Sequence, residues 1–372
     1  MALGPLPSYP WDEIAPIRER AAQHPDGVID LSIGSPVDET PKVLRDALAA
    51  ATEWHAYPTT VGTSDARDAV VEWFARRRGV SGLNKDEVLL TVGSKEFIAF
   101  AAFFLGLGEG DVIVQPSLAY PTYEMGARFA GATCVSEDDP AAWPENTKLV
   151  WLNSPGNPDG RVLGVDELRA AIARARELGA IVIGDECYAE LGWGRWAEAV
   201  PSVLDPRVNG GSYEGILACS SLSKQSNVAG YRAAFVAGDG ALVEQLVRAR
   251  KHAGLIVPGP VQEVIAVALR DDAHVAEQRA RYEARREVLV NALTAAGCVI
   301  DASEGGLYLW VTHGTSDMDT MHWLAELGIV AGPGHFYGAA GGRHVRISLT
   351  ASDAEISRVA ERLQGSGQDL TR

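Results

Sequence analysis

The sequence is poor in cysteine, and its four cysteines (Cys134, Cys187, Cys219 and Cys298) lie far apart with no CxxC pair. This spacing argues against a disulfide framework and against a cysteine-rich metal site, so we expect reduced thiols that fill small spaces in the core. The eight histidines show no ligand spacing either. The sequence therefore predicts no metal centre.

Long apolar runs are also missing. The longest one, residues 97–107, is shorter than the roughly 20 residues that a membrane-spanning helix needs. The first twenty residues contain no basic segment followed by an apolar run, which is the pattern of a secretory signal. We therefore expect a cytoplasmic protein that does not bind a membrane.

Positive charge is scarce, because 33 lysines and arginines face 49 aspartates and glutamates, a net charge of −16. Proteins that bind nucleic acid generally need the opposite sign to contact phosphates, so no nucleic-acid partner is expected. An anionic substrate would need a local cationic pocket. No GxGxxG follows an early strand, which argues against a Rossmann dehydrogenase.

What the sequence does contain is an alternation of short apolar runs and amphipathic segments between about residues 85 and 255. Runs such as LVWL and AIVIG are apolar throughout, which is typical of strands buried on both faces. The pattern predicts an α/β fold, with a three-layer α/β/α large domain around a mostly parallel sheet. Seven strands are expected, at residues 88–92, 112–115, 132–135, 149–153, 181–185, 216–220 and 233–237.

The residue pattern changes at the Pro-Gly-Pro of residues 258–260. Long charged helical segments and short alternating strands follow it. This pattern indicates a second, smaller α+β domain. We expect three parts: an N-terminal segment (residues 1–45) that packs with the small domain, a large domain (residues 46–257) and a small C-terminal domain (residues 258–372).

In sheets of this kind, ligands bind beyond the carboxyl ends of the strands. Lys224 lies at such a place, in the run SSLSK after the strand at 216–220. A lysine there is ordinarily a solvated loop residue, and it forms a Schiff base only when its pKa falls. Arg232 follows eight residues later, and an arginine beside serine hydroxyls would make a phosphate cup.

Two more strand ends carry polar residues. Asp185 ends the apolar strand at 181–185, where a carboxylate is costly unless a cation faces it. A protonated pyridine nitrogen at about 4 Å would attract it by about 4 kcal/mol at an effective dielectric near 20, and Tyr188 would reach a ring hydroxyl. The turn NSPGNPDG presents Asn157, whose backbone Pro158 biases toward an extended form. Taken singly, Asp185 could equally cap the next segment, and Asn157 could belong to an ordinary turn.

Taken in their order, Asn157, Asp185, Tyr188, Lys224 and Arg232 resemble the fold-type I pyridoxal-phosphate aminotransferases of the aspartate aminotransferase superfamily. The resemblance implies that Lys224 forms a Schiff base with pyridoxal 5′-phosphate, that Asp185 pairs with the pyridine nitrogen, and that Asn157 and Tyr188 contact the ring oxygen. It implies further that Tyr120 stacks on the ring face. The phosphate would be bound by Ser221, by Arg232, by the loop of Gly93, Ser94 and Lys95, and by Tyr57 of the other subunit.

The resemblance extends from Gly34 to Arg346. It implies that Arg346, with Gly34 and Asn157, binds the substrate α-carboxylate, the arginine through a two-pronged contact. It also implies a homodimer with shared active sites and a ping-pong transfer of the amino group, with glutamate and 2-oxoglutarate as the expected pair. Asp159 and Ala66 depart from the residues usual in the family, threonine and leucine.

Segments such as ECYAELGWG and PGHFYGAAGGRHVRISL are most similar to actinobacterial-type N-succinyldiaminopimelate aminotransferases of lysine biosynthesis. That similarity implies a long anionic acceptor, N-succinyl-2-amino-6-ketopimelate, whose far end Lys95, Lys251 or His252 would bind. Lys95 could instead serve the phosphate, and the other two could be a solvated helix face. The alternatives are an aminotransferase for aspartate, alanine or aromatic amino acids, and a carbon–sulfur lyase on the same scaffold.

Overall fold

The computed structural model describes residues 10–366, and its largest element is a seven-stranded sheet, as the apolar runs predict. In spatial order the strands are β2 (Val88–Val92), β8 (Ala233–Gly238), β7 (Ile216–Ser221), β6 (Ile181–Asp185), β5 (Thr147–Asn153), β3 (Val112–Gln115) and β4 (Thr133–Ser136). Each predicted strand is present within two residues of its expected bounds. The sheet is mostly parallel, and β8 is its one antiparallel member, running against both β2 and β7.

Helices cover both faces of this sheet and make the three predicted layers. Alternate strand residues point to opposite faces, and those of one face pack in a cluster with α3, α6 and α10. Those of the other face pack with α4, α5 and α9. These helices are α3 (Ser64–Arg78), α6 (Val165–Leu178), α10 (Gly259–Arg270), α4 (Ser94–Phe104), α5 (Thr122–Ala130) and α9 (Gly240–Ala253), and two short ones, α7 (Pro206–Asn209) and α8 (Leu222–Gln225), follow β6 and β7.

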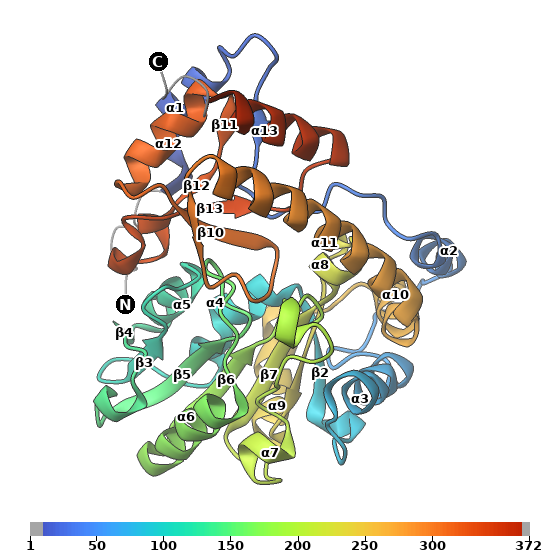
Figure 1. The fold of residues 1–372 in the computed structure, drawn as a ribbon. Helices are drawn as coiled ribbons and strands as arrows, with labels where there is room; N and C mark the ends of the chain where they lie inside the picture. Colours follow the sequence, from blue (N-terminus) through green and yellow to red (C-terminus); the bar gives the residue numbers. More distant parts are fainter. Residues whose placement is uncertain (1–9, 367–372) are drawn as a thin grey trace.

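A second apolar cluster lies in the upper half of Figure 1, above the carboxyl ends of the parallel strands. Its antiparallel sheet has the order β12 (Gly332–Pro333), β13 (Val345–Ser348), β10 (Tyr308–Thr312), β9 (Val299–Asp301). The helices around it are α11 (Asp272–Ala295), α12 (Asp317–Glu326) and α13 (Asp353–Ser366). This is the smaller domain that the sequence predicts.

The N-terminal part of the chain contacts both halves. Helix α1 (Ala15–Ala21) belongs to the upper cluster, and β1 (Ile29–Asp30) pairs in parallel with β11 (Ile329–Val330). Helix α2 (Lys42–Ala50) packs on α10 instead, at the right edge of Figure 1. Residues 1–9 of the expected N-terminal segment lie outside the described residues.

The division of the chain at residues 45 and 257 stays a prediction. The apolar residues of α10 pack in the cluster beneath the seven-stranded sheet, although α10 follows residue 257. We propose to move the second boundary to about residue 271, between α10 and α11. The sequence pattern changes at the prolines before α10. The apolar face of α10 is nevertheless buried against the large domain, and this burial assigns the helix to that domain.

Two of the helices on one face of the sheet are joined by a buried ion pair. Arg250 of α9 is fully buried, and its Nη1 and Nη2 donate to Oε1 and Oε2 of Glu96 at 2.5 and 2.8 Å. Oε2 of Glu96 also accepts from the backbone N–H of Val92 at 3.1 Å. The pair therefore fixes the start of α4 against α9 and against the end of β2.

Replacing Glu96 with alanine should destabilise the protein by about 3–5 kcal/mol, because it leaves the buried guanidinium of Arg250 without its carboxylate. Urea unfolding of the cofactor-free protein measures this loss. Glu124→Ala is the matched control, since Glu124 pairs with Arg128 on the exposed surface of α5 and should contribute less than about 1 kcal/mol. Equal losses in the two variants would contradict the prediction.

Candidate active site

The predicted residues at the strand ends come together below the smaller sheet. Lys224 is the third residue of α8, and its Nζ donates to the carbonyl oxygen of Gly34 in the loop after β1. This contact joins the large domain to the N-terminal part of the chain. Ser221, the residue before α8, accepts from the backbone N–H of Ser223 at 3.2 Å, and the two hydroxyls are 2.9 Å apart.

Asp185 is buried at the end of β6 with uncharged partners. Its Oδ2 accepts from the hydroxyl of Tyr123 at 2.6 Å, and its Oδ1 accepts from the backbone N–H of Cys187 at 3.2 Å. Burial raises the pKa of Asp185, and these hydrogen bonds offset the rise only in part. Within residues 10–366 no basic side chain forms an ion pair with it. A carboxyl in such a place is suited to a cationic ligand group.

The loop between β2 and α4 meets Arg232 at close range. Gly93 has φ +75°, and a Cβ there would lie 2.0 Å from Nη2 of Arg232, so only glycine lets the guanidinium lie against this loop. Arg232 itself adopts the left-handed conformation (φ +57°), and its carbonyl accepts from the N–H of Gly93 at 2.8 Å. Ser94 begins α4, whose first N–H groups have no partner within the helix and attract anions.

Arg346 is the second charged residue that the site buries. It lies on β13 with 5% of its surface exposed, and its Nη1 and Nη2 donate to Oδ1 of Asn157 at 2.8 Å and to the carbonyl of Ser32 at 2.7 Å. Its Nε has no partner, and no described carboxylate forms an ion pair with it. The guanidinium lies over the rings of Tyr308 and Tyr337, 3.9 and 4.9 Å from their centroids.

The remaining predicted residues lie at different distances from this centre. Tyr188 is buried, with its hydroxyl 3.3 Å from that of Tyr308. Tyr120 packs edge-to-face on Tyr123, and burial raises its pKa to about 12. Tyr57 is 99% exposed in the single chain, as a side chain that reaches into another subunit would be. Lys95, Lys251 and His252 are exposed, the first at the start of α4 and the other two at the end of α9.

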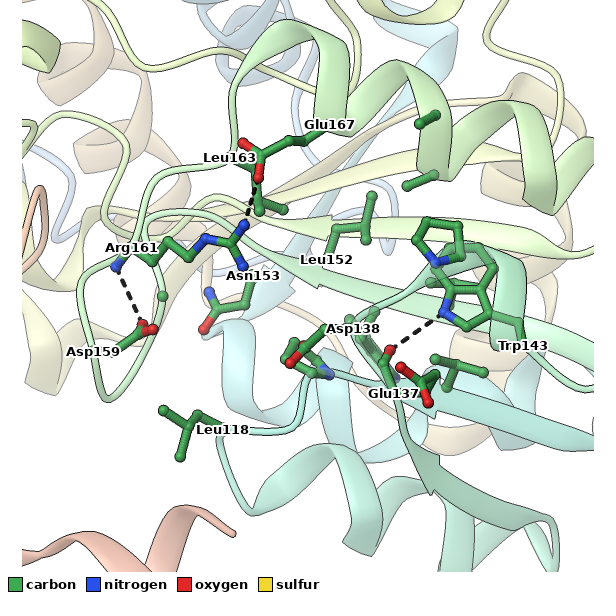
Figure 2. A pocket seen from close by; sticks show the side chains of 18 residues that line it. Leu118, Glu137, Asp138, Trp143, Leu152, Asn153, Asp159, Arg161, Leu163 and Glu167 are labelled. Atoms are coloured by element: carbon green, nitrogen blue, oxygen red, sulfur yellow. Dashed lines mark hydrogen bonds and ion pairs between the residues drawn. The ribbon is translucent and has the colours of Figure 1, made fainter. Parts of the chain in front are cut away.

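A cavity of about 310 Å³ opens on the other side of the turn that carries Asn157, between the ends of β3 and β5 and helix α6. Figure 2 shows it with Leu118, Trp143 and Asn153 in its wall and with Arg161 paired to Glu167 at its rim. Neither Lys224 nor Arg346 lines it. The volume of a cavity is therefore a poorer guide to the reaction centre here than the convergence of charged groups.

Comparison with known proteins agrees with this geometry. Residues 26–363 match the model of the family described as aminotransferase class I and II. The chain belongs to this family. It is 51% identical over 359 residues to 4-dedimethylamino-4-oxo-anhydrotetracycline transaminase OxyQ of Streptomyces rimosus, covering 96% of this chain and 99% of that one. It is 49% identical to the probable aminotransferase Rv1178 of Mycobacterium tuberculosis, covering 96% and 85%.

A solved structure gives the same fold. The probable N-succinyldiaminopimelate aminotransferase of Thermus thermophilus superposes with a TM-score of 0.86 at 26% identity, covering 96% of this aminotransferase and 100% of that chain. The recognised superfamily and fold are thus confirmed. The narrower likeness to the succinyldiaminopimelate enzymes is not singled out, because the two relatives near 50% identity carry other names.

Membership of the class I and II aminotransferases implies dependence on pyridoxal 5′-phosphate, and the residues present fit that group. Arg232 in contact with Gly93, and the hydroxyls of Ser221 and Ser223, offer donors to an anion, and no described carboxylate is paired to the guanidinium. Asp185 offers a buried negative charge, and Lys224 offers an amine. The role of each residue remains a prediction from the resemblance. In the part of the chain that the structure describes, no helix is long and apolar enough to span a bilayer and no cluster of three metal-ligating side chains occurs.

Sequence reasoning missed several residues of this centre, above all Tyr123, Tyr308 and Ser223. Tyr123 carries a usable signal, because it lies three residues after Tyr120 at the start of a helix and so near the same strand end. Tyr308 carries none, since it is an ordinary member of an alternating strand. Its place depends on which strands pair in the smaller sheet.

Replacing Asp185 with asparagine should stabilise the cofactor-free protein at neutral pH while weakening cofactor binding by at least about tenfold, because a buried uncompensated charge is removed. The raised pKa means that the folded protein holds this proton more tightly than the unfolded chain does. Its contribution to stability therefore falls as pH rises from the ordinary aspartate range through the raised folded pKa. The advantage of the variant should accordingly shrink toward pH 4.

Urea unfolding between pH 4 and 8 measures this difference. The exposed Asp166, on the first turn of α6, supplies the control variant Asp166→Asn, for which no such pH trend is expected. A stability advantage of Asp185→Asn that stays constant across this range would contradict the assignment.

Proposed function

We propose that this aminotransferase transfers the amino group of glutamate to an α-keto acid by a ping-pong reaction, and that the acceptor is N-succinyl-2-amino-6-ketopimelate. The observation that carries the proposal is the buried guanidinium of Arg346, which has an unpartnered Nε and no carboxylate partner among the described residues. A buried arginine of this kind is suited to bind a carboxylate through two parallel hydrogen bonds.

Each residue of the site would have a distinct role in this reaction. Lys224 Nζ would hold the cofactor aldehyde and move the proton at the substrate Cα, as general base and then as general acid. Asp185 would face the ring nitrogen, and Tyr188 and the Nδ2 of Asn157 would donate to the ring oxygen, since Oδ1 of Asn157 is already engaged by Arg346. When bound, the cofactor supplies a ring that stabilises the carbanion left at Cα.

The proposed assembly is a homodimer with shared active sites. Tyr57 supports it, because its side chain is fully exposed in the loop before α3 and is therefore accessible to another subunit. The proposed acceptor is supported by the fold shared with the Thermus thermophilus protein described as a probable N-succinyldiaminopimelate aminotransferase. The distal carboxylates of such an acceptor need cations, for which Lys95, Lys251 and His252 are the candidates.

A second candidate acceptor is a polycyclic ketone. The observation that favours it is the 51% identity to OxyQ, whose name describes a 4-oxo-anhydrotetracycline transaminase. A ketone of this type lacks the α-carboxylate that Arg346 would bind, so the two candidates differ in their dependence on one side chain.

Lys224→Ala should abolish both the yellow colour that the purified protein takes up with pyridoxal 5′-phosphate and the conversion of glutamate to 2-oxoglutarate, because no other amine replaces the lysine. Absorbance and mass spectrometry after borohydride reduction check this, with Lys251→Ala as an exposed control. Full turnover in Lys224→Ala would sink the proposal. Release of ammonia and sulfide from a cysteine substrate, without 2-oxoglutarate from glutamate, would favour the lyase.

Arg346→Gln should lower kcat/KM for α-keto acids by on the order of 100-fold, because two charge-assisted hydrogen bonds to the carboxylate are lost. Arg343→Gln, on the exposed turn before β13, is the control and should stay within about twofold of the native protein. The measurement is a panel of acceptors with glutamate as donor, including the succinylated keto-pimelate and a polycyclic ketone. If only the ketone is accepted, and if its kcat/KM, which reports the second half-reaction alone, is undiminished in Arg346→Gln, the second acceptor replaces the first.

A further inference from the structure

One buried tyrosine outside the predicted site contacts three of its members. Tyr308 begins β10 in the smaller sheet, pairs in register with Ser348 of β13 and has 4% of its surface exposed. In Figure 1, β10 lies on the side of the small domain that faces the large sheet. Its side chain is thus delivered to the reaction centre by the domain opposite Lys224.

The ring and the hydroxyl of Tyr308 have different neighbours. The guanidinium of Arg346 lies 3.9 Å above the ring centroid, a cation–π contact. The hydroxyl is 3.3 Å from that of Tyr188, whose ring meets the Tyr308 ring at 71°. A substitution that keeps the ring and removes the oxygen can therefore separate the two roles.

The hydroxyl also packs on Gly34. A Cβ at that glycine would lie 2.0 Å from the Tyr308 oxygen, so the position must remain without a side chain for the oxygen to fit. The carbonyl of the same glycine accepts from Lys224 Nζ. The Tyr308 oxygen thus lies beside both the Tyr188 hydroxyl and the Gly34 segment, whose carbonyl contacts Lys224.

The two hydroxyls of the pair lie in different electrostatic surroundings. Burial alone would raise the pKa of Tyr308, but the positive charges of Arg346 and Lys224 lower it below the ordinary value. Burial raises the pKa of Tyr188 well above that value. Each hydroxyl has one hydrogen, so when Tyr188 donates to the ring oxygen, as proposed, the bond between the two phenols uses the hydrogen of Tyr308.

Other titratable groups also face these two phenols. They are the phenols of Tyr120 and Tyr282 and the thiol of Cys187, and burial keeps all three uncharged at neutral pH by raising their pKa. For Cys187, the hydrogen bond between its thiol and that of the neighbouring Cys219 contributes more to this rise than burial does.

We propose that Tyr308 is a positioning residue of the reaction centre, whose hydroxyl directs the hydroxyl of Tyr188 toward the cofactor ring oxygen while its ring supports Arg346. The inference rests on the proposed function, in which Tyr188 donates to that oxygen. Tyr308 acts through Tyr188 and Arg346 and transfers no proton to the substrate itself.

The test is the pH titration of the visible absorbance of the protein loaded with pyridoxal 5′-phosphate, in Tyr308→Phe, Tyr188→Phe and the double variant. A hydrogen bond donated to the ring oxygen stabilises the negative charge on that oxygen. It therefore favours the deprotonated form of the bound cofactor. Both single variants should therefore move the midpoint to higher pH, Tyr308→Phe by about half a pH unit. The double variant should shift no further than Tyr188→Phe alone, because Tyr308 acts through Tyr188.

A second arm separates the ring from the hydroxyl. The dissociation constant of 2-oxoglutarate, titrated calorimetrically into the loaded protein, should stay within about twofold in Tyr308→Phe and rise about tenfold in Tyr308→Leu, which lacks the aromatic support of Arg346. Gly34→Ala should shift the absorbance midpoint in the same direction as Tyr308→Phe, since its methyl group displaces the same oxygen.

The outcomes distinguish this inference from the function on which it rests. An unshifted midpoint in loaded Tyr308→Phe, or a double variant in which the two shifts add, overturns the inference and leaves the proposed function standing. A native protein that does not take up the cofactor on Lys224 overturns both.

Discussion

The arrangement of this molecule depends on two buried charges that have no opposite charge beside them in residues 10–366. Asp185 lies at the end of a strand in the large sheet, and Arg346 lies on a strand of the smaller sheet. Each is costly to bury, because the protein interior solvates ions poorly. Neither can neutralise the other, since each is held by its own hydrogen-bond partners. In the proposed function, the cationic ring of the cofactor and the carboxylate of the substrate would offset these two costs, and both would lie between the two domains.

The turn between β5 and α6 begins beside Asp185, which pairs in register with Asn153 at the end of β5, and it reaches Arg346. It carries Asn157, whose side chain accepts from Arg346. Two residues later it contacts the small domain, where Ser303 and Gly305 donate backbone N–H groups to the carbonyls of Asp159 and Gly160 at 2.7 and 2.9 Å. Gly160 has φ +69°, and a Cβ there would lie 2.5 Å from the carbonyl oxygen of Gly305, so the close approach requires glycine. The turn thus connects Arg346, proposed to bind the substrate, with the large domain, and Asp159 keeps a backbone contact to the small domain although it departs from the family pattern.

The residues proposed to hold the cofactor and those proposed for the acceptor lie in different parts of this chain. The residues proposed to hold the cofactor lie at strand ends, where backbone hydrogen bonds fix their positions. The candidates for the far end of the acceptor are exposed side chains on helix ends. Such side chains change readily without cost to the fold. This explains why relatives with the same scaffold carry names that describe different acceptors.

The sequence by itself determined the strands of the large sheet, the three layers and the order of the residues around Lys224. Continuous apolar runs have few alternatives to burial on both faces, and the strand ends bring their polar residues to one edge. Only the tertiary structure decided that β8 runs antiparallel, that α10 packs with the large domain, and that Tyr123 and Tyr308 reach Asp185 and Arg346. Strand direction and the pairing of distant segments follow from packing between residues far apart in the chain. No local pattern of residues predicts such packing.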